Sequence, residues 1–313
     1  VIEGEEECGS TGLAGNLESR AEQLRAGVLM VCDTDTVRSG APTLVMGLRG
    51  IVGLSLDLSG PSHDLHSGLH GGLAPNVAQA MARIVASLHD GDGRVAVDGF
   101  YDGVTPPSDT ERRLAAAEGF DEQTYTADVG VPPVGGEAGF TPVERIGFRP
   151  SLDINGLVTG YGGEGLKTVI PATARAKITA RLVPDQDPQA CLNAIEDHCR
   201  RRVPRGLTLQ AADRTDGGPG FRLNVDSPLV QRARGVLDSL DDRPTAFLWE
   251  GASIPIVSRL ADVSGAEPLL VGFGCERDHI HAPNESFSLA QFKRGFHYAA
   301  RMLHALAGES LRT

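Results

Sequence analysis

The sequence has few of the residues that disulfide-bonded, nucleic-acid-binding or membrane-spanning proteins need. Its five cysteines are odd in number, lie far apart and form no Cys-x-x-Cys pair, which excludes a disulfide framework and a structural zinc knuckle. Aromatic residues make up only 5% of the chain, too few for the stacking platforms that bind single-stranded nucleic acid. No run approaches the roughly 18 apolar residues of a membrane span. These absences favour a protein of a reducing, cytoplasmic compartment.

Positive charge is also scarce. The 29 Lys and Arg residues face 41 Asp and Glu residues, so the 313-residue chain has a formal net charge of −12. Such a charge repels nucleic acid phosphates and anionic membrane surfaces, and we expect neither as a partner. The acidic N-terminal residues are the opposite of a basic signal peptide. The length is a prior for about two domains.

Hydrophobic periodicity predicts two kinds of structure along the chain. The outer parts contain short apolar runs typical of buried strands, at 27–33 and 269–273, and a terminal amphipathic helix at 287–306. The middle part predicts strand, helix, strand, strand, helix and strand, the split βαβ order of a ferredoxin-like layer. These elements are expected at 51–59, 76–88, 152–159, 173–183, 187–202 and 207–211. Residues 90–150, rich in Gly, Pro, Asp and Thr, predict an elaborated insertion.

The sequence therefore predicts an α/β protein with two domains. Residues 1–47 and 219–313 would form a catalytic domain with a mixed sheet. Residues 48–218 would form an inserted α+β, ferredoxin-like lid and dimerisation domain. We expect a homodimer through this lid, with strand 51–59 and helix 75–89 extending the sheet and helix layer across a two-fold axis.

Four segments are richer in carboxylate and imidazole side chains than their surroundings. They are Glu3–Ser10, Asp33 at the end of its strand, Ser62–Gly68 with the nearby His70, and Asp278–Glu285. Each also has an ordinary interpretation: a solvated acidic loop, a cap, a surface turn, and a helix-capping or core histidine. Carboxylates with histidine at strand ends favour a metal such as zinc or manganese and hydrolysis by activated water. No His-Glu-x-x-His motif, phosphate loop or dinucleotide fingerprint occurs.

Seven segments in fixed order resemble the M20 family of metallopeptidases. They are EGEEECGS at 3–10, VCD at 31–33, GLRG at 47–50, HDLHSG at 63–68, KTVIPATARAKITARLVP at 167–184, WEGASIP at 249–255 and HIHAPNE at 279–285. The DLHSG and EGASIP segments look most like the cytosolic dipeptidase branch of the family. None of the nine histidines starts the family's upstream His-x-Asp metal motif, so we expect this chain to lack the N-terminal part of the family.

The resemblance implies a role for each matching residue. Glu6 would be the general base that takes a proton from a metal-bridging water, and two divalent ions, zinc or manganese, would be bound with the help of Glu7, Asp33 and His281. His66 would stabilise the oxyanion in the active site of the other subunit. A substrate carboxylate would be held by Arg181, whose planar guanidinium suits bidentate recognition. Further substrate contacts would come from Glu250, Ser253, Asn155 and Thr168.

The leading hypothesis is a di-metal hydrolase that cleaves the amide bond of dipeptides or similar small substrates with a free carboxylate. One alternative is an N-acyl amino acid deacylase of the same family, which shares the chemistry but has a different pocket. Another is a non-catalytic, dimerising remnant, because the upstream metal motif is absent.

Overall fold

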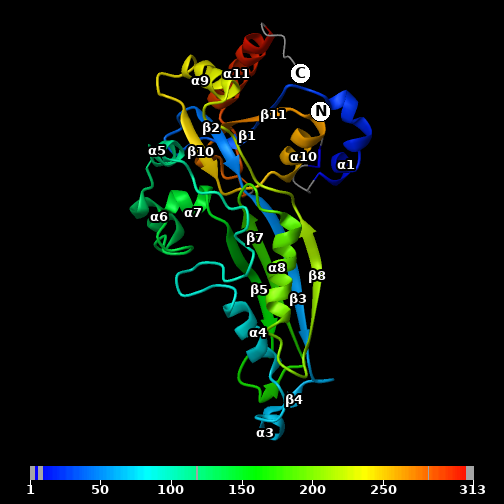
Figure 1. The fold of residues 1–313 in the computed structure, drawn as a ribbon. Helices are drawn as coiled ribbons and strands as arrows, with labels where there is room; N and C mark the ends of the chain where they lie inside the picture. The colour runs from blue at the N-terminus through cyan, green and yellow to red at the C-terminus, as the bar shows by residue number, and fades with distance from the viewer. Residues whose placement is uncertain (1–3, 6–9, 118, 281, 308–313) are drawn as a thin grey trace.

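The computed structural model describes residues 4–5, 10–117, 119–280 and 282–307 of the chain. Two β-sheets lie at opposite ends of an elongated molecule (Figure 1). The chain leaves the upper sheet through Arg49 and returns to it through Gly217–Gly220. The predicted domain boundaries, after residues 47 and 218, fall beside these two crossings and stay predictions. Among the described residues, no helix has the length and apolar character needed to cross a membrane.

The upper sheet is mixed, as predicted for the catalytic domain. Its order is β1-β11-β2-β10, with β1 parallel to β11, β2 antiparallel to β11 and parallel to β10, and the short β9 paired to β2. Helices α9 and α11 share an apolar core with one face of this sheet, and α10 packs on other residues of the same strands. The bounds are β1 Val28–Asp35, β2 Thr43–Leu48, β9 Phe221–Arg222, α9 Pro228–Asp238, β10 Ala246–Glu250, α10 Pro255–Ser264, β11 Glu267–Gly274 and α11 Leu289–Ala307.

The lower sheet confirms the ferredoxin-like prediction. Its four strands are all antiparallel, in the order β5-β7-β3-β8, and the chain order is β3-α4-β5-β7-α8-β8. The bounds are β3 Gly50–Ser59, α4 Val77–Ala86, β5 Ser151–Thr159, β7 Thr173–Leu182, α8 Pro188–Arg200 and β8 Thr208–Asp216. One expectation is wrong: β3 lies between β7 and β8, so strand 51–59 has no free edge with which to extend the sheet across a dimer axis.

Period-two alternation builds the core of this domain. Along β7, Ala174, Ala176, Ile178, Ala180 and Leu182 are buried on one face, as the sequence pattern predicts. The buried residues of α4 and α8 belong to the same apolar cluster as these strands. Asn76 caps α4 by accepting a hydrogen bond from the Gln79 backbone, and Asp187 caps α8 through Ala190. The sheet is therefore covered on one face by two capped amphipathic helices.

The insertion between α4 and β5 contains only short helices, as expected from its composition. The last of them, α7, begins with a capping box in which the Thr141 and Glu144 side chains bond to each other's backbone N–H groups. Directly after it, the Phe148 ring packs against Trp249 of β10 at 5.1 Å between centroids. The insertion is thereby joined to the upper sheet. The short helices of the described residues are α1 Thr11–Ala14, η2 Glu18–Arg20, α2 Ala21–Leu24, α3 Ser67–His70, α5 Asp109–Ala117, α6 Glu122–Val129, α7 Pro142–Gly147 and η3 Glu276–Asp278.

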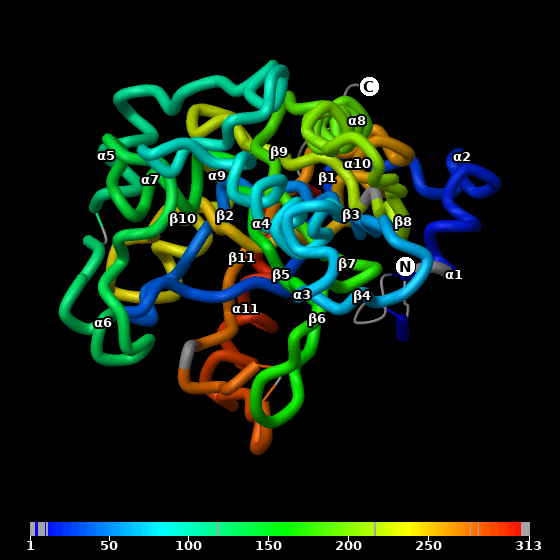
Figure 2. Tube along the Cα trace, turned by 90° about the horizontal axis from the view of Figure 1, so that it is seen from below, coloured from blue at the N-terminus to red at the C-terminus, as the bar shows by residue number. Residues whose placement is uncertain are grey.

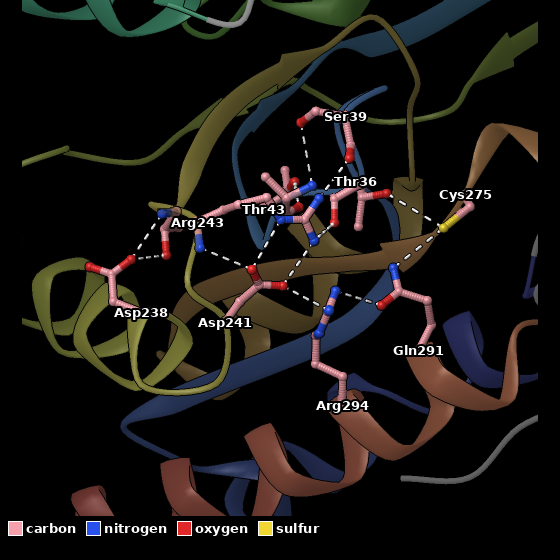
Figure 3. A network of polar contacts seen from close by, with 12 residues as sticks. Thr36, Ser39, Thr43, Asp238, Asp241, Arg243, Cys275, Gln291 and Arg294 are labelled. Carbon is pink, nitrogen blue, oxygen red and sulfur yellow. Dashed lines mark hydrogen bonds and ion pairs between the residues drawn. The ribbon is translucent and has the colours of Figure 1, made fainter.

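A network of charged side chains ties α11 to the loops of the upper sheet (Figure 3). Asp241 accepts hydrogen bonds from Arg243 through both carboxylate oxygens and lies 2.7 Å from the Arg294 guanidinium of α11. Arg243 also donates to the carbonyls of Ser39 and Gly40, at 2.7 and 2.9 Å. Hydrogen bonds from the Arg243 side chain and backbone, together with the charge of Arg294, hold the pKa of Asp241 at about 2, although burial opposes this shift.

We expect Asp241→Asn to lower the free energy of unfolding by about 2 kcal/mol at neutral pH, because each unit of pKa shift corresponds to about 1.4 kcal/mol. The folded-state pKa lies below the ordinary value of 3.8, so the stabilisation is complete above about pH 4 and is lost as the pH falls toward 2. Urea unfolding of the wild type and the variant at several pH values measures the difference. Asp242→Asn, the same change at the exposed neighbour, is the control; an equal effect of both variants would refute the role of the network.

Candidate functional site

A cleft of about 760 Å³ lies where β1, β10 and β11 end. Its lining brings together Asp33, Glu250 and Ser253, three of the residues predicted for the site. Further carboxylates line it as well: Asp35, Asp278 and Glu285. The sequence therefore correctly places Asp33 at the carboxyl end of a strand and beside the WEGASIP segment, although more than 200 residues separate the two. A cleft with this lining presents oxygen donors and negative charge to a ligand.

A β-bulge positions Asp33. Along β1, Val31 is opposite Leu270 and Thr34 is opposite Gly272, so three steps on β1 face two on β11. The extra residue lies within Cys32–Asp33. A bulge turns a side chain out of the regular alternation and is frequent beside active sites. The Asp33 side chain is exposed at the cleft as a result.

Two carboxylates of the cleft, Glu250 and Asp35, have raised pKa values. Burial, followed by the charge of Asp35, raises the pKa of Glu250 to about 7, although a hydrogen bond with the Asp35 backbone opposes this shift. Burial also raises the pKa of Asp35, with the charges of Asp278 and Asp33 adding to the effect. Asp278 is only 3% exposed. Its side chain accepts a hydrogen bond from the Cys275 backbone at 2.8 Å. Such mutual repulsion is relieved by a proton or a cation.

The lower sheet places a cation beside the cleft, in contact with one of its lining residues. Arg181, on β7, donates a hydrogen bond from Nη1 to Oγ of Ser253 at 2.7 Å. Its strand position is opposite Ile51 and Ser151, at the end of the lower sheet nearest the crossings. Burial lowers the pKa of this guanidinium, and Asp153 opposes the shift. A partly buried guanidinium beside a serine hydroxyl is suited to hold a carboxylate.

His66 and Thr168 lie together, but far from the cleft of their own chain. His66 belongs to β4, Leu65–His66, and pairs with Val169 of β6, Val169–Ile170. The Ser67 backbone donates to the Thr168 carbonyl at 3.1 Å at the start of α3, Ser67–His70. Figure 1 shows β4 and α3 at the end of the molecule opposite the upper sheet, and Figure 2 looks at the molecule from this end. The His66 side chain is exposed there, and its Nδ1 accepts a hydrogen bond from the Gly68 backbone at 3.0 Å.

Asn155 lies in a second bulge. On β5, Ile154 is opposite Ile178 and Gly156 is opposite Lys177, which leaves Asn155 as the extra residue. Its side chain is exposed at the edge of the lower sheet, because β5 has a neighbour on one side only. Two of the predicted site residues, Asp33 and Asn155, thus fall in irregularities that periodicity alone does not reveal.

The metal site remains a prediction. Glu6, Glu7 and His281 lie outside the described residues, so Asp33 is the one predicted ligand within them. Within the described part of the chain, no group of three or more His, Cys, Asp or Glu side chains is arranged to hold a metal ion. The carboxylates of the cleft have the right chemistry for divalent cations, yet by themselves they do not make a site.

Three carboxylates of the cleft, Asp35, Asp278 and Glu285, were not assigned a role from the sequence. Asp35 follows Asp33 by two residues, and alternate residues of a strand share a face. This spacing is the signal that could have found it. Its backbone passes so close to β11 that a Cβ at Gly272 would lie 1.9 Å from the Asp35 carbonyl, so glycine is needed there. Asp278 belongs to a segment singled out from the sequence, but its hydrogen bond with Cys275 could not be foreseen.

The fold and the cleft together define a two-domain α/β protein in which a ferredoxin-like domain adjoins the domain that bears the site. Residues 46–206, more than half of the chain, match the model of the M20 peptidase dimerisation domain. The chain belongs to this family, and the resemblance inferred from the sequence is confirmed.

Curated relatives and solved structures agree with this assignment. The chain is 29% identical over 310 residues to the Cys-Gly metallodipeptidase DUG1 of Saccharomyces cerevisiae, covering 96% of this chain and 64% of that protein. It is 23% identical to the Beta-Ala-His dipeptidase of Rattus norvegicus, covering 94% of this chain and 61% of that one. The M20 family metallo-carboxypeptidase Sso-CP2 of Sulfolobus solfataricus has a TM-score of 0.81 at 26% identity, with 96% and 68% covered. The chain thus spans somewhat less than two-thirds of the length of these two curated relatives.

Proposed function

We propose that the protein hydrolyses the amide bond of dipeptides or similar small substrates that carry a free carboxylate. The observation that carries the proposal is the cleft, which is lined by clustered carboxylates at strand ends and by Ser253, the hydrogen-bond partner of Arg181. The names of the relatives, which are metallodipeptidases in fungi and Beta-Ala-His dipeptidases in mammals, support the same reaction.

Each described residue has a proposed task in binding. Arg181 and Ser253 hold the carboxylate of the substrate, because a guanidinium recognises a carboxylate through two parallel hydrogen bonds. Glu250, whose pKa of about 7 lets it carry a proton near neutral pH, contacts the rest of the substrate. Asn155 and Thr168 add contacts from the lower domain, and Thr168, which lies with His66 far from its own cleft, does so in the site of the partner subunit. Glu6, which lies outside the described residues, acts as the general base.

The M20 family implies divalent metals, for which we propose Glu7, Asp33 and His281 as ligands, with zinc or manganese as the two ions. Bound metal would supply a water of low pKa and polarise the substrate carbonyl. The described residues do not complete such a site, so the metal content of the purified protein is a measurement in its own right.

The full-length protein should hydrolyse dipeptides, and paired substitutions test how the glutamate run is used. Glu6→Gln should abolish hydrolysis and leave the metal content nearly unchanged, because an amide cannot accept the proton. Glu7→Gln should lower the metal content instead. Kinetics on a panel of dipeptides and N-acyl amino acids measures the hydrolysis, and mass spectrometry measures the metal content. Cleavage of N-acyl amino acids alone would favour a deacylase, and no hydrolysis with no metal would favour a non-catalytic protein.

We also propose that the lower domain forms a homodimer in which His66 acts in the partner's site. The family model is a dimerisation domain, and β4, which contains His66, lies at the end of the molecule opposite the upper sheet (Figure 1). The free edges β5 and β8, rather than β3, are available to extend the lower sheet.

Mixing two inactive variants of the full-length protein tests this sharing. His66→Ala and Glu6→Gln subunits should form heterodimers with one intact site, so up to about a quarter of wild-type activity should return. Loss of an oxyanion donor typically costs about 10²–10³ in rate, which leaves a low background. As the control, each single variant is mixed with the double variant His66→Ala, Glu6→Gln, which cannot complete a site with either of them. No recovery after demonstrated subunit exchange would place His66 outside the partner's site.

A further inference from the structure

The passage from the upper to the lower sheet takes a single residue, Arg49, between the end of β2 and the start of β3. Its backbone N–H donates to the Ala252 carbonyl at 3.0 Å, and its side-chain Nε donates to the Gly251 carbonyl, also at 3.0 Å. Arg49 therefore holds two consecutive carbonyls of the loop that joins Glu250 to Ser253.

The other end of the same guanidinium reaches the lower domain. Nη1 of Arg49 lies 3.4 Å from the Arg149 carbonyl and 3.4 Å from Oγ of Ser151, at the start of β5. Gly251 leaves room for this arrangement, because a Cβ at that position would lie 2.7 Å from Nη2 of Arg49. One planar side chain thus contacts the cleft loop and the first residues of β5 together.

The guanidinium is held in an environment that works against its charge. Burial lowers the pKa of Arg49 to about 10, with the nearby charge of Arg181 adding to the effect and Asp153 opposing it. Arg49 still carries its proton at neutral pH, so all of its N–H groups remain donors. A buried cation next to a second cation is costly, and structural ion pairing alone would place a carboxylate against it. Its side chain instead donates to backbone carbonyls and a hydroxyl.

We infer that Arg49 is a positioning residue for the cleft: by clamping the Gly251 and Ala252 carbonyls to the start of β5, it sets Ser253 against Arg181. The inference deepens the proposed function, on which it rests for its catalytic consequence. Arg49 forms hydrogen bonds to Gly251, Ala252, Arg149 and Ser151, none of which has a proposed role in catalysis or substrate binding. It acts through Ser253, which lies on the loop between β10 and α10.

The protein contains its own reporter of this clamp. Trp249, the sole tryptophan of the chain, precedes Glu250 and is 2% exposed. Its ring packs on Phe148, the residue before Arg149, whose carbonyl faces Arg49. The Arg49 guanidinium therefore contacts residues that closely follow the two packed rings, Arg149 after Phe148 and Gly251 shortly after Trp249. If the clamp opens, the contact between the rings loosens, and a quencher in solution gains access to Trp249.

Acrylamide quenching of Trp249 fluorescence tests the clamp directly in the folded protein. Arg49→Met should raise the quenching constant at least twofold, because the side chain keeps much of its apolar length but loses every donor. Arg49→Lys should lie between Arg49→Met and the wild type. The control is Arg175→Met, which breaks a bidentate pair with Asp57 on the lower sheet away from the crossing. An unchanged constant in folded Arg49→Met would overturn the inference.

A second variant tests the clamp without changing Arg49. Gly251→Ala should displace the guanidinium, since the added Cβ collides with it, and should raise quenching in the same direction. This variant decides the matter if Arg49→Met does not fold. Wild-type quenching in folded Gly251→Ala would then count against the inference.

Steady-state kinetics on the full-length protein test the catalytic consequence. Arg49→Lys should raise KM for dipeptides about tenfold and leave kcat within about threefold, because a displaced Ser253 weakens substrate binding more than the chemical step. An equal loss in kcat with unchanged KM would contradict a role through Ser253. If the wild-type protein hydrolyses no substrate, the proposed function fails, while the quenching comparison still decides whether Arg49 clamps the loop.

Discussion

The two chain crossings between the sheets run in close contact, and this contact fixes how the two domains meet. A Cβ at Gly50 would lie 2.5 Å from the Gly218 carbonyl, and one at Gly220 would lie 2.9 Å from the Gly50 nitrogen. Glycine at these positions lets the outgoing and returning chains run backbone against backbone. Hydrogen bonds between Ile51 and residues Gly217 and Gly218, at 3.0 and 3.3 Å, join them. The two sheets are therefore fixed to each other without a side chain between the crossings.

This contact brings chemistry of opposite charge to one place. β3 leaves the crossing paired with β7, and the register opposite Ile51 is occupied by Arg181. The upper sheet presents carboxylates at its strand ends, where like charges destabilise one another and favour a bound cation or proton. The lower sheet supplies the guanidinium that such a cleft lacks. Arg49, at the crossing itself, contacts the loop between the two sets of groups. The position of the Arg181 guanidinium beside a cleft of carboxylates thus follows from the way the domains are joined.

Much of the fold could be predicted because its strands and helices have strong periodicity. The expected strand at 173–183 is observed at Thr173–Leu182, and the terminal helix expected at 287–306 is observed at Leu289–Ala307. β2 and β10 were not predicted, since both are short and lack the alternation that marks a half-buried strand. The role of β3 in a dimer was wrongly expected, because strand order within a sheet is set by long-range pairing that periodicity does not encode.

The candidate site was predictable only in part for a related reason. Asp33, Glu250 and Ser253 meet in the cleft as the order of motifs suggests, whereas the bulges at Asp33 and Asn155 and the contacts of Arg49 arise from register and from domain packing. Asp35 gains the neighbours that raise its pKa, Asp278 among them, only when the strand ends come together. Local sequence identifies which residues are chemically able to act, and tertiary contacts decide which of them do.

We propose that the domain crossing brings Arg181 to the edge of the cleft, beside Ser253, where it selects a substrate carboxylate. The most direct measurement compares kcat/KM for a dipeptide and for its C-terminal amide in the full-length wild type, Arg181→Lys and Arg181→Met. We predict a preference of about 10² or more for the free carboxylate in the wild type, a reduced preference with lysine and almost none with methionine. An undiminished preference for the carboxylate in folded Arg181→Met would contradict the claim.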